Sequence, residues 1–367
     1  MIFRQITVID PVTLTSEKKD LYVSNGVFTD SLEGDSKQDA NNGDGLYAAP
    51  GFMDLHVHCG PKMRLTAGIP PDRMGIRQGV TTLVDAGSAG IDNFAMFQRD
   101  VIRKSTTRVL FFLNIARTGL ATRAELKDMG NLMTADEFDH FRREHGENLV
   151  GIKVRMSRSA LVDSGISPLV HARDIAQKAG LPLMVHIGNG PPTLDEILDT
   201  LSEGDIVTHC FHGKKGGLAD CHDAYARAVE RGVCFDVGHG SESFSIHAVD
   251  PVLKIRQVDF SISTDLHRLS IHKPVGSLMA TMSKFFTLGY GVEDVVRRVT
   301  VVPSRFIGRP CPPIQAGEKA TMTIFRLVPS SKSLIDSEGN PVKPDRILEP
   351  VMTFVDGECV WGNHAKV

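Results

Sequence analysis

The chain has 367 residues, 41% hydrophobic and 23% charged, with 41 basic against 44 acidic side chains and a net charge of −3. This length can bury a large core, and the mixed charges do not favour nucleic acid or an acidic membrane as a partner. No apolar run approaches the roughly 18 residues of a membrane span, and residues 1–10 lack a signal-peptide pattern. The six cysteines include no close-spaced pair. Together these features favour a cytoplasmic protein.

The first predicted elements are antiparallel strands. Ile2–Ile9 has the apolar pattern of a strand, and Leu21–Asp30 alternates apolar and polar residues on either side of an Asn-Gly pair. Asn-Gly favours the left-handed backbone of a two-residue hairpin turn. We therefore expect a strand and then a β-hairpin near the start of the chain.

Eight short segments follow, most of them β-branched and apolar almost without interruption, as parallel strands buried on both faces are. They are Gly51–His58, Gly79–Ala86, Val109–Ala116, Leu149–Met156, Leu181–Ile187, Asp205–Cys210, Val233–Val237 and Asp259–Asp265. Helical patterns lie between them, such as Thr134–Glu144, which begins with the capping box Thr134 and Glu137. Eight strand–helix alternations over roughly 250 residues predict an α/β fold, a (β/α)8 TIM barrel at residues 51–308.

The last predicted elements are again antiparallel strands. Lys319–Leu327 reads as one strand, and Thr353–Trp361 reads as a second hairpin, around an Asp-Gly pair. Because both ends of the chain have this pattern, we expect residues 1–50 and 309–367 to form a small β-sandwich domain beside the barrel.

Two histidines stand one residue apart in the first barrel strand. Side chains alternate along a strand, so His56 and His58 point to the same face, and two converging imidazoles make half of a tetrahedral metal site. Core histidines bonded to backbone carbonyls are the alternative. Asp54 has the same parity and is expected either to orient a ligand imidazole or to serve as a structural carboxylate.

Other ionisable residues lie in or at the ends of later strands. Lys153 lies in the fourth strand, and His186, His209 and Asp265 end the fifth, sixth and eighth. Active sites of TIM barrels lie at the carboxyl ends of the strands, so we expect these side chains to converge with the histidine pair on a metal site. A single strand-end histidine is often structural, and Lys153 paired with a barrel acid is a further alternative.

These residues resemble the metal constellation of the amidohydrolase superfamily: the histidine pair after Pro-Gly-Phe-Met-Asp, the strand lysine, two single histidines and a late aspartate. The resemblance covers nearly the whole chain, and Gly317–Ile324 is similar to the family's return from barrel to flanking sheet. The segments GIKVRMS, THCFHG and FDVGHG are similar to the dihydroorotase-like and deacetylase branch, in particular to proteins that resemble acetyl-(R)-mandelate esterases.

The resemblance implies a centre of two divalent metal ions, with zinc expected and manganese, iron or cobalt as alternatives. The ligand set that it implies is His56, His58 and Asp265 for one ion and His186 and His209 for the other, with Lys153 as the bridge. Burial should lower the pKa of the Lys153 amine, which can then react with carbon dioxide to form an anionic carbamate. Metal ions would acidify a water molecule into a nucleophile, and Asp265 is the expected catalytic residue that moves its proton to the leaving group.

Three further residues are predicted to contact the substrate. Arg155 shares the parity of Lys153 and offers a guanidinium to a substrate carboxylate, with a salt bridge at the rim as the alternative. His239 follows the seventh strand between two glycines, and Asn114 lies near the end of the third, where it can donate to a substrate oxygen. Three loop histidines are possible pocket residues, although most loop histidines make no contact with a substrate: His212, His267 and His272.

We therefore expect a metal-dependent hydrolase that cleaves an acyl ester or amide of a small carboxylate-bearing substrate, as a deacetylase does. One alternative is the opening of a cyclic amide, as in dihydroorotases and hydantoinases, and another is a non-catalytic metal-binding relative. Purine deamination is less favoured, because the deaminases of the superfamily typically use one metal and lack the bridging lysine. The expected partners are a small acidic molecule and further copies of the chain, and neither nucleic acid nor a membrane.

Overall fold

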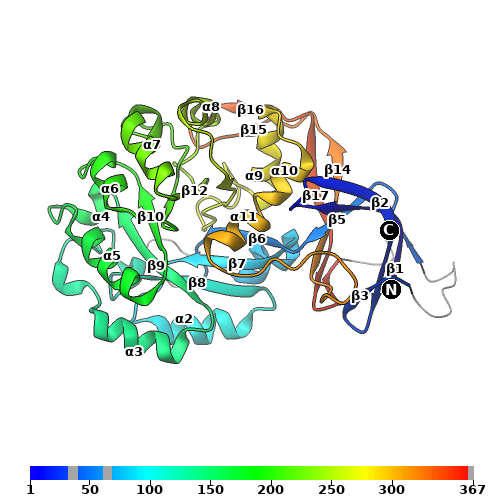
Figure 1. The fold of residues 1–367 in the computed structure, drawn as a ribbon, viewed down its shortest axis with the longest axis horizontal. Coiled ribbons are helices and arrows are strands. Elements are labelled where there is room, and N and C mark those ends of the chain that lie inside the picture. The colour runs from blue at the N-terminus through cyan, green and yellow to red at the C-terminus, as the bar shows by residue number, and fades with distance from the viewer. Residues whose placement is uncertain (32–39, 61–67, 363–367) are drawn as a thin grey trace.

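The computed structural model describes residues 1–31, 40–60 and 68–362. It has two parts side by side: a barrel ringed by helices at the left of Figure 1, and a sheet at the right, where both termini lie. No helix of the described residues is long and apolar enough to cross a bilayer. All six cysteines are free thiols.

Eight parallel strands pair in sequence order and confirm the predicted barrel. They are β6 (Phe52–Val57), β7 (Val80–Ala86), β8 (Arg108–Asn114), β9 (Leu149–Met156), β10 (Leu183–Ile187), β11 (Ile206–Thr208), β12 (Cys234–Asp236) and β13 (Phe260–Ser261). The circle closes through a parallel bridge between Val57 and Leu266 and a 2.6 Å hydrogen bond from Asp265 N to His56 O. The last strand is much shorter than predicted, and Asp265, with φ of 48°, turns the chain out of the extended conformation beyond it.

The helices ring the barrel (Figure 1). They are α1 (Pro71–Met74), α2 (Phe94–Asp100), α3 (Ala135–His145), α4 (Arg158–Leu161), α5 (Ser167–Ala179), α6 (Leu194–Thr200), α7 (His222–Glu230), α8 (Ile246–Ile255), α9 (Leu278–Lys284), α10 (Val292–Arg297) and α11 (Val301–Phe306). The capping box predicted for α3 is present: Thr134 N donates to Glu137 Oε2 at 2.8 Å, and Glu137 N donates to Thr134 Oγ1 at 3.3 Å. This exchange satisfies two backbone N–H groups that the first turn of a helix leaves unpaired.

The second part is one sheet made from both ends of the chain. Its order is β18-β17-β14-β5-β1-β2-β3, with β4 on β1. The strands are β1 (Ile2–Asp10), β2 (Thr15–Ser24), β3 (Val27–Thr29), β4 (Ala40–Asn42), β5 (Leu46–Pro50), β14 (Met322–Pro329), β17 (Arg346–Val355) and β18 (Glu358–Trp361), while β15 (Leu334–Ile335) and β16 (Pro341–Val342) pair separately. Strand β5 pairs with β1 on one side and with β14 on the other, which joins the two ends.

The small β-sandwich predicted from the two termini is built from one sheet that curls around its own apolar core. Phe3 of β1 and Phe354 of β17 have ring centroids 6.0 Å apart, although β5 and β14 lie between them in the sheet. Phe28 N also donates to Glu318 O at 2.9 Å, so the β2–β3 hairpin meets the segment before β14. One curled sheet thereby encloses the core that two stacked sheets would enclose. The domain limits at residues 50 and 309 stay a prediction.

Both hairpin turns have the backbone that their sequences predict. Asn25 and Gly26 have φ of 50° and 80°, and Asp356 and Gly357 have φ of 48° and 86°. Two successive left-handed residues define the turn that suits the twist of a β-hairpin.

Candidate metal centre

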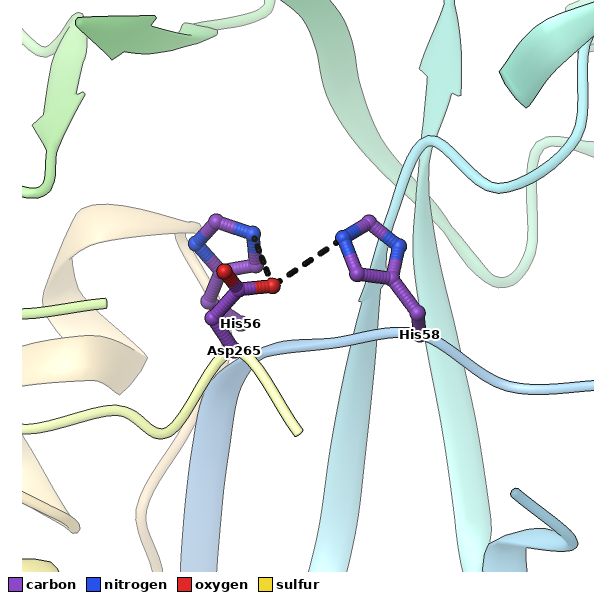
Figure 2. Close-up of side chains that lie close together, drawn as sticks. All are labelled: His56, His58 and Asp265. Atoms are coloured by element: carbon purple, nitrogen blue, oxygen red, sulfur yellow. Dashed lines mark ion pairs between the residues drawn. The ribbon is translucent and has the colours of Figure 1, made fainter. Parts of the chain in front are cut away.

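Three predicted ligands converge at the carboxyl ends of the barrel strands (Figure 2). His56 Nε2 lies 3.4 Å and His58 Nε2 lies 3.1 Å from the same oxygen, Asp265 Oδ1. One ligand atom from each residue falls within 4.8 Å of the others, a spacing at which one metal ion can bind all three. His56 and His58 are buried. Burial alone would raise the pKa of the Asp265 carboxyl, but the close imidazole of His58 lowers it to about 2, which keeps the carboxylate anionic.

Asp265 is held in place through its neighbour Thr264. Its left-handed conformation is unfavourable for a residue with a side chain, so the surrounding structure must impose it. Asp54 does so from β6: it accepts hydrogen bonds from Thr264 N at 3.0 Å and from Thr264 Oγ1 at 2.5 Å. Of the two roles open to Asp54, the structure favours the structural one, because the carboxylate bonds the loop that carries Asp265.

Lys153 lies beside these residues in β9. Its Nζ is 3.5 Å from His56 Nε2, its side chain is 3% exposed, and burial lowers the pKa of the amine to about 7. Lys153 forms no ion pair with a described residue, so the alternative of a lysine paired with a barrel acid has no support in this geometry. A buried amine with this pKa is partly neutral at pH 7, and the neutral form is the one that reacts with carbon dioxide.

His186 and His209 form a second pair. His186 Nδ1 and His209 Nε2 are 2.8 Å apart, and the rings of His209 and His56 have centroids 5.1 Å apart. His209, with φ of 72°, is a second left-handed residue of the site, and its Nδ1 lies 2.6 Å from Gly238 O. This contact makes Nδ1 the protonated nitrogen, which leaves the Nε2 lone pair facing His186. Burial lowers the pKa of His209 to about 3 and that of His186 well below its usual value, so both rings are neutral.

The donors of this site fit a divalent cation. Asp265 Oδ1 is buried without a hydrogen-bond partner among the described residues, which is costly unless a cation or water contacts it. The Nδ1 atoms of His56 and His58 lie 2.7 Å from Thr208 Oγ1 and 2.9 Å from Ser88 Oγ, so both Nε2 atoms face inward. Ligand histidines of metal sites are oriented in this way by a hydrogen bond at their other ring nitrogen.

The hydrogen bonds behind these histidines were not predicted from the sequence. Thr208 donates to Asp236 Oδ2 at 2.8 Å, and Ser261 and Ser263 donate to the same carboxylate at 2.6 and 2.7 Å. On the other side, Asp85 accepts from Ser88 N at 2.7 Å. One feature of the sequence could have indicated these hydrogen bonds: Asp85 and Asp236 are acidic residues near the ends of mostly apolar strands.

Arg155 has a protein partner that the sequence did not reveal. Its Nε and Nη2 donate to the two oxygens of Glu125 at 2.7 and 2.6 Å, and Nη1 donates to Ser159 Oγ at 3.2 Å. The Glu125 side chain is fully buried. Arg155 therefore forms a salt bridge, which was the alternative to substrate binding. Glu125 occupies the pair of guanidinium donors that a substrate carboxylate would need.

His239 and Asn114 also have protein partners. His239 Nε2 lies 2.6 Å from the Nζ of Lys284, a lysine in α9 that sequence reasoning missed. Asn114 Nδ2 donates to Gly87 O, and its Oδ1 accepts from Ala116 N, both at 2.9 Å. His239 thus contacts helix α9, and Asn114 bonds the loops after β7 and β8. Contact of either side chain with a substrate stays a prediction.

The loop histidines differ in their surroundings. His272 is exposed. The ring of His267 has its centroid 6.5 Å from that of His58, close to the centre. His212 is buried without a hydrogen-bond partner for either ring nitrogen among the described residues.

Comparisons with known proteins find relatives over most of the chain, while no family model matches it. A protein named deacetylase from Enterococcus faecalis is 36% identical over 336 residues, which cover 89% of this chain and 90% of the relative. A deacetylase from Brucella anthropi is 35% identical over 338 residues, which cover 90% of this chain and 84% of that protein. The deacetylase Atu3266 from Agrobacterium fabrum is 36% identical over 324 residues, with 86% and 79% covered.

Solved structures resemble the whole molecule. A crystal structure of a dihydroorotase superposes with a TM-score of 0.89 at 32% identity, covering 99% of this chain and 97% of that chain. A crystal structure of an adenine deaminase superposes with a TM-score of 0.87 at 31% identity and covers 99% of both chains.

Proposed function

Since the chain belongs to the amidohydrolase superfamily, we propose that it is a metal-dependent deacetylase that hydrolyses an acyl ester or amide of a small carboxylate-bearing substrate. Its relatives and structural neighbours make it a hydrolase of this superfamily. The observation that carries the proposal is the convergence of His56 Nε2 and His58 Nε2 on Asp265 Oδ1, with the Lys153 amine beside them. The names of the three relatives support deacetylation as the reaction.

The proposed centre holds two divalent ions, with zinc as the expected metal because imidazole and carboxylate oxygen suit it. The ligand set proposed is His56, His58 and Asp265 for one ion and His186 and His209 for the other, with carboxylated Lys153 between them. The carbamate would add a negative charge to a set in which Asp265 is the only other anion. That charge offsets part of the positive charge of two dications.

When bound, the ions supply a Lewis acid for the acyl carbonyl and acidify a water molecule. The residues of the chain determine where protons go. Asp265 is anionic and its Oδ1 faces the centre, so it can accept the proton of the attacking water and deliver it to the leaving oxygen or nitrogen. The fixed Nδ1 contacts of His56 and His58 hold both rings in one orientation throughout.

Two further parts of the proposal concern the setting of the enzyme. We place it in the cytoplasm, where a chain with free cysteines and no disulfide is ordinary. We also expect it to act as a homo-oligomer on a small molecule, without nucleic acid or a membrane as partner.

The test is metal analysis combined with a substrate screen. Purified protein should contain about two divalent ions per chain, and it should release acetate from members of a panel of N-acetyl and O-acetyl carboxylic acids. His247→Ala, a change at an exposed histidine of α8, serves as the control and should behave as wild type. Protein that carries two ions and releases no acetate from any panel member would contradict the proposal.

Hydrolysis of a cyclic amide is the second candidate, favoured by the likeness to a dihydroorotase at 32% identity. The same panel should therefore include dihydroorotate and hydantoins. Ring opening without acetate release would replace the first proposal with this one. One ion per chain and ammonia release from adenine would instead indicate a deaminase, as the likeness to an adenine deaminase allows.

A further inference from the structure

The β15–β16 hairpin leaves the sheet made from both ends of the chain and meets the barrel beside α8 (Figure 1). The chain enters the hairpin from β14 and continues from it to β17, and both of these strands belong to the terminal sheet. The turn segment, residues 336–338, contacts residues that lie 90 to 98 positions earlier in the chain, between β12 and the start of α8. Part of the terminal region thus reaches a loop of the barrel.

Asp336 fixes the shape of this turn and binds the start of α8. The residue is 1% exposed, and its Oδ1 accepts hydrogen bonds from Glu338 N and Asn340 N, both at 2.9 Å. Its Oδ2 accepts from the N–H of Ile246, the first residue of α8, at 3.0 Å. The first N–H groups of a helix have no partner within the helix, and a carboxylate beside them is favourable. The turn segment is therefore anchored to the barrel.

Ser337 and Glu338 bond the loop between β12 and α8. Ser337 Oγ lies 3.1 Å from His239 O and 3.0 Å from Gly240 O, so its one hydroxyl proton serves these two carbonyls. Ser245 Oγ, at the other end of the loop, donates to Glu338 Oε2 at 2.7 Å. The turn segment thus holds the β12–α8 loop at two places.

The same loop contacts two proposed metal ligands. Gly238 O lies 2.6 Å from His209 Nδ1. Gly240 N donates to Thr264 O at 2.9 Å, next to Asp265 in the chain. A Cβ added at Gly240 would lie only 2.7 Å from Asp265 Oδ2, so the backbone of the loop packs closely against the carboxylate. A shift of the loop would therefore disturb the supports of both ligands.

We propose that Ser337 is a positioning residue of the metal centre: it holds the β12–α8 loop in the place from which the loop fixes His209 and Asp265. This rests on the proposed function, because it assumes that these two residues hold the ions. Ser337 acts through the backbone of residues 238–240. A misplacement of about 1 Å can cost on the order of 10²-fold in rate, so a hydroxyl behind this loop can control turnover.

The test combines hydrogen exchange with kinetics on the metal-loaded protein. Ser337→Ala removes the hydroxyl that faces two loop carbonyls, so the backbone amides of residues 238–240 and 263–266 should exchange at least about fivefold faster, measured by mass spectrometry. For the best substrate of the acetyl panel, kcat should fall at least about tenfold while KM stays within about twofold of wild type. Both ions should remain bound at saturating zinc.

Matched variants separate positioning from a purely structural role. Ser333→Ala changes an exposed serine of the same excursion, whose hydroxyl bonds Leu334 O, and should match wild type in exchange and in kcat. Ser337→Thr keeps the hydroxyl and should restore most of kcat. A purely structural role would lower the free energy of unfolding of Ser337→Ala and leave the kcat of the folded protein unchanged.

Glu338→Ala tests the same loop if Ser337→Ala does not fold. Glu338 is exposed, and the change removes the acceptor for Ser245 Oγ. We expect kcat to fall at least about threefold, with faster exchange at residues 238–246. Glu358→Ala, at an exposed glutamate of β18, is the control and should behave as wild type.

The outcomes distinguish this inference from the function on which it rests. An unchanged kcat in Ser337→Ala and Glu338→Ala would overturn the inference even in an active deacetylase, whether or not exchange is faster. An equal loss of kcat in Ser333→Ala would do the same. A wild type that releases no acetate would instead remove deacetylation, and exchange at residues 263–266 that depends on Ser337 would leave the positioning of Asp265 standing.

Discussion

At the scale of single residues, the centre depends on two side chains in an unfavourable backbone conformation. His209 and Asp265 both have positive φ, which costs a non-glycine residue on the order of 1–3 kcal/mol. Each is compensated by buried contacts: His209 Nδ1 with Gly238 O, and the Thr264–Asp54 hydrogen bonds next to Asp265. The strain places Nε2 of one residue and Oδ1 of the other in the interior of the site.

Replacing Asp265 should abolish turnover and leave the fold intact. Asp265→Asn keeps the shape of the side chain but removes the negative charge and the base, so we expect kcat to fall by at least about 10³-fold. Most metal at His186 and His209 should remain, measured as ions per chain. Circular dichroism should match wild type. Turnover within about tenfold of wild type with both ions present would remove Asp265 from the mechanism.

Replacing Lys153 should remove the bridge between the proposed ions. Lys153→Ala eliminates the only buried amine adjoining His56 among the described residues, so we expect less than two ions per chain and a loss of at least about 10³-fold in kcat. Metal analysis and acetate release measure the two effects separately. A variant that retained two ions and full activity would show that Lys153 does not bridge.

At the scale of elements, the Arg155–Glu125 pair joins β9 to the segment that follows β8. Removing one member of a buried ion pair leaves the other charge without a partner, so Arg155→Met should lower the free energy of unfolding by about 3 kcal/mol. Urea unfolding measures this, with Arg155→Met/Glu125→Gln recovering part of the loss. Hydrolysis of acidic and neutral substrates should fall equally. A loss confined to acidic substrates would instead assign Arg155 to substrate binding, as first predicted from the sequence.

Most elements could be predicted because their signals are local. The eight strands show as apolar runs, the cap of α3 as Thr134 and Glu137, and both hairpins as Asn-Gly and Asp-Gly. The alternation of side chains along a strand and the position of Asp265 at a strand end also predicted that His56 and His58 would meet Asp265, as they do in the structure. The partners of Arg155 and His239 could not be predicted, because Glu125 and Lys284 come from loops and helices whose position only the tertiary fold sets. The curl of the terminal sheet depends on long-range packing in the same way.

At the scale of the whole molecule, the buried Lys284 of α9 should make the stability of the fold depend on pH. Its Nζ lies 2.6 Å from His239 Nε2 and donates to Pro274 O at 2.9 Å. Burial lowers the pKa of His239, and the charge of Lys284 lowers it further. Burial lowers the pKa of Lys284 to about 7, while Asp336 acts in the opposite direction. Between pH 7 and the usual pKa near 10.5, the unfolded chain therefore binds a proton that the folded chain does not.

The stability of the fold should therefore fall as the pH is lowered from 10 to 7, and Lys284→Met should remove this part of the dependence. When the pH is lowered from 10 to 7, the free energy of unfolding of the wild type should fall relative to that of the variant by on the order of 2–4 kcal/mol. Denaturant unfolding at the two pH values measures it, with the exposed Lys343→Met as control. An equal difference at both pH values would mean that Lys284 is charged in the folded protein.

The seam between sheet and barrel has a consequence for synthesis on the ribosome. Phe52 N donates to Thr323 Oγ1, a contact between residues 271 positions apart, and β5 pairs with β14 across a similar separation. At about 5–20 residues per second, the early strands wait roughly 15–50 s for their partner to be made. During that interval, the edge of β5 with which β14 later pairs is open to other nascent chains. Chaperone demand in the cell should therefore follow the translation rate of the intervening segment more closely than the stability of the finished protein.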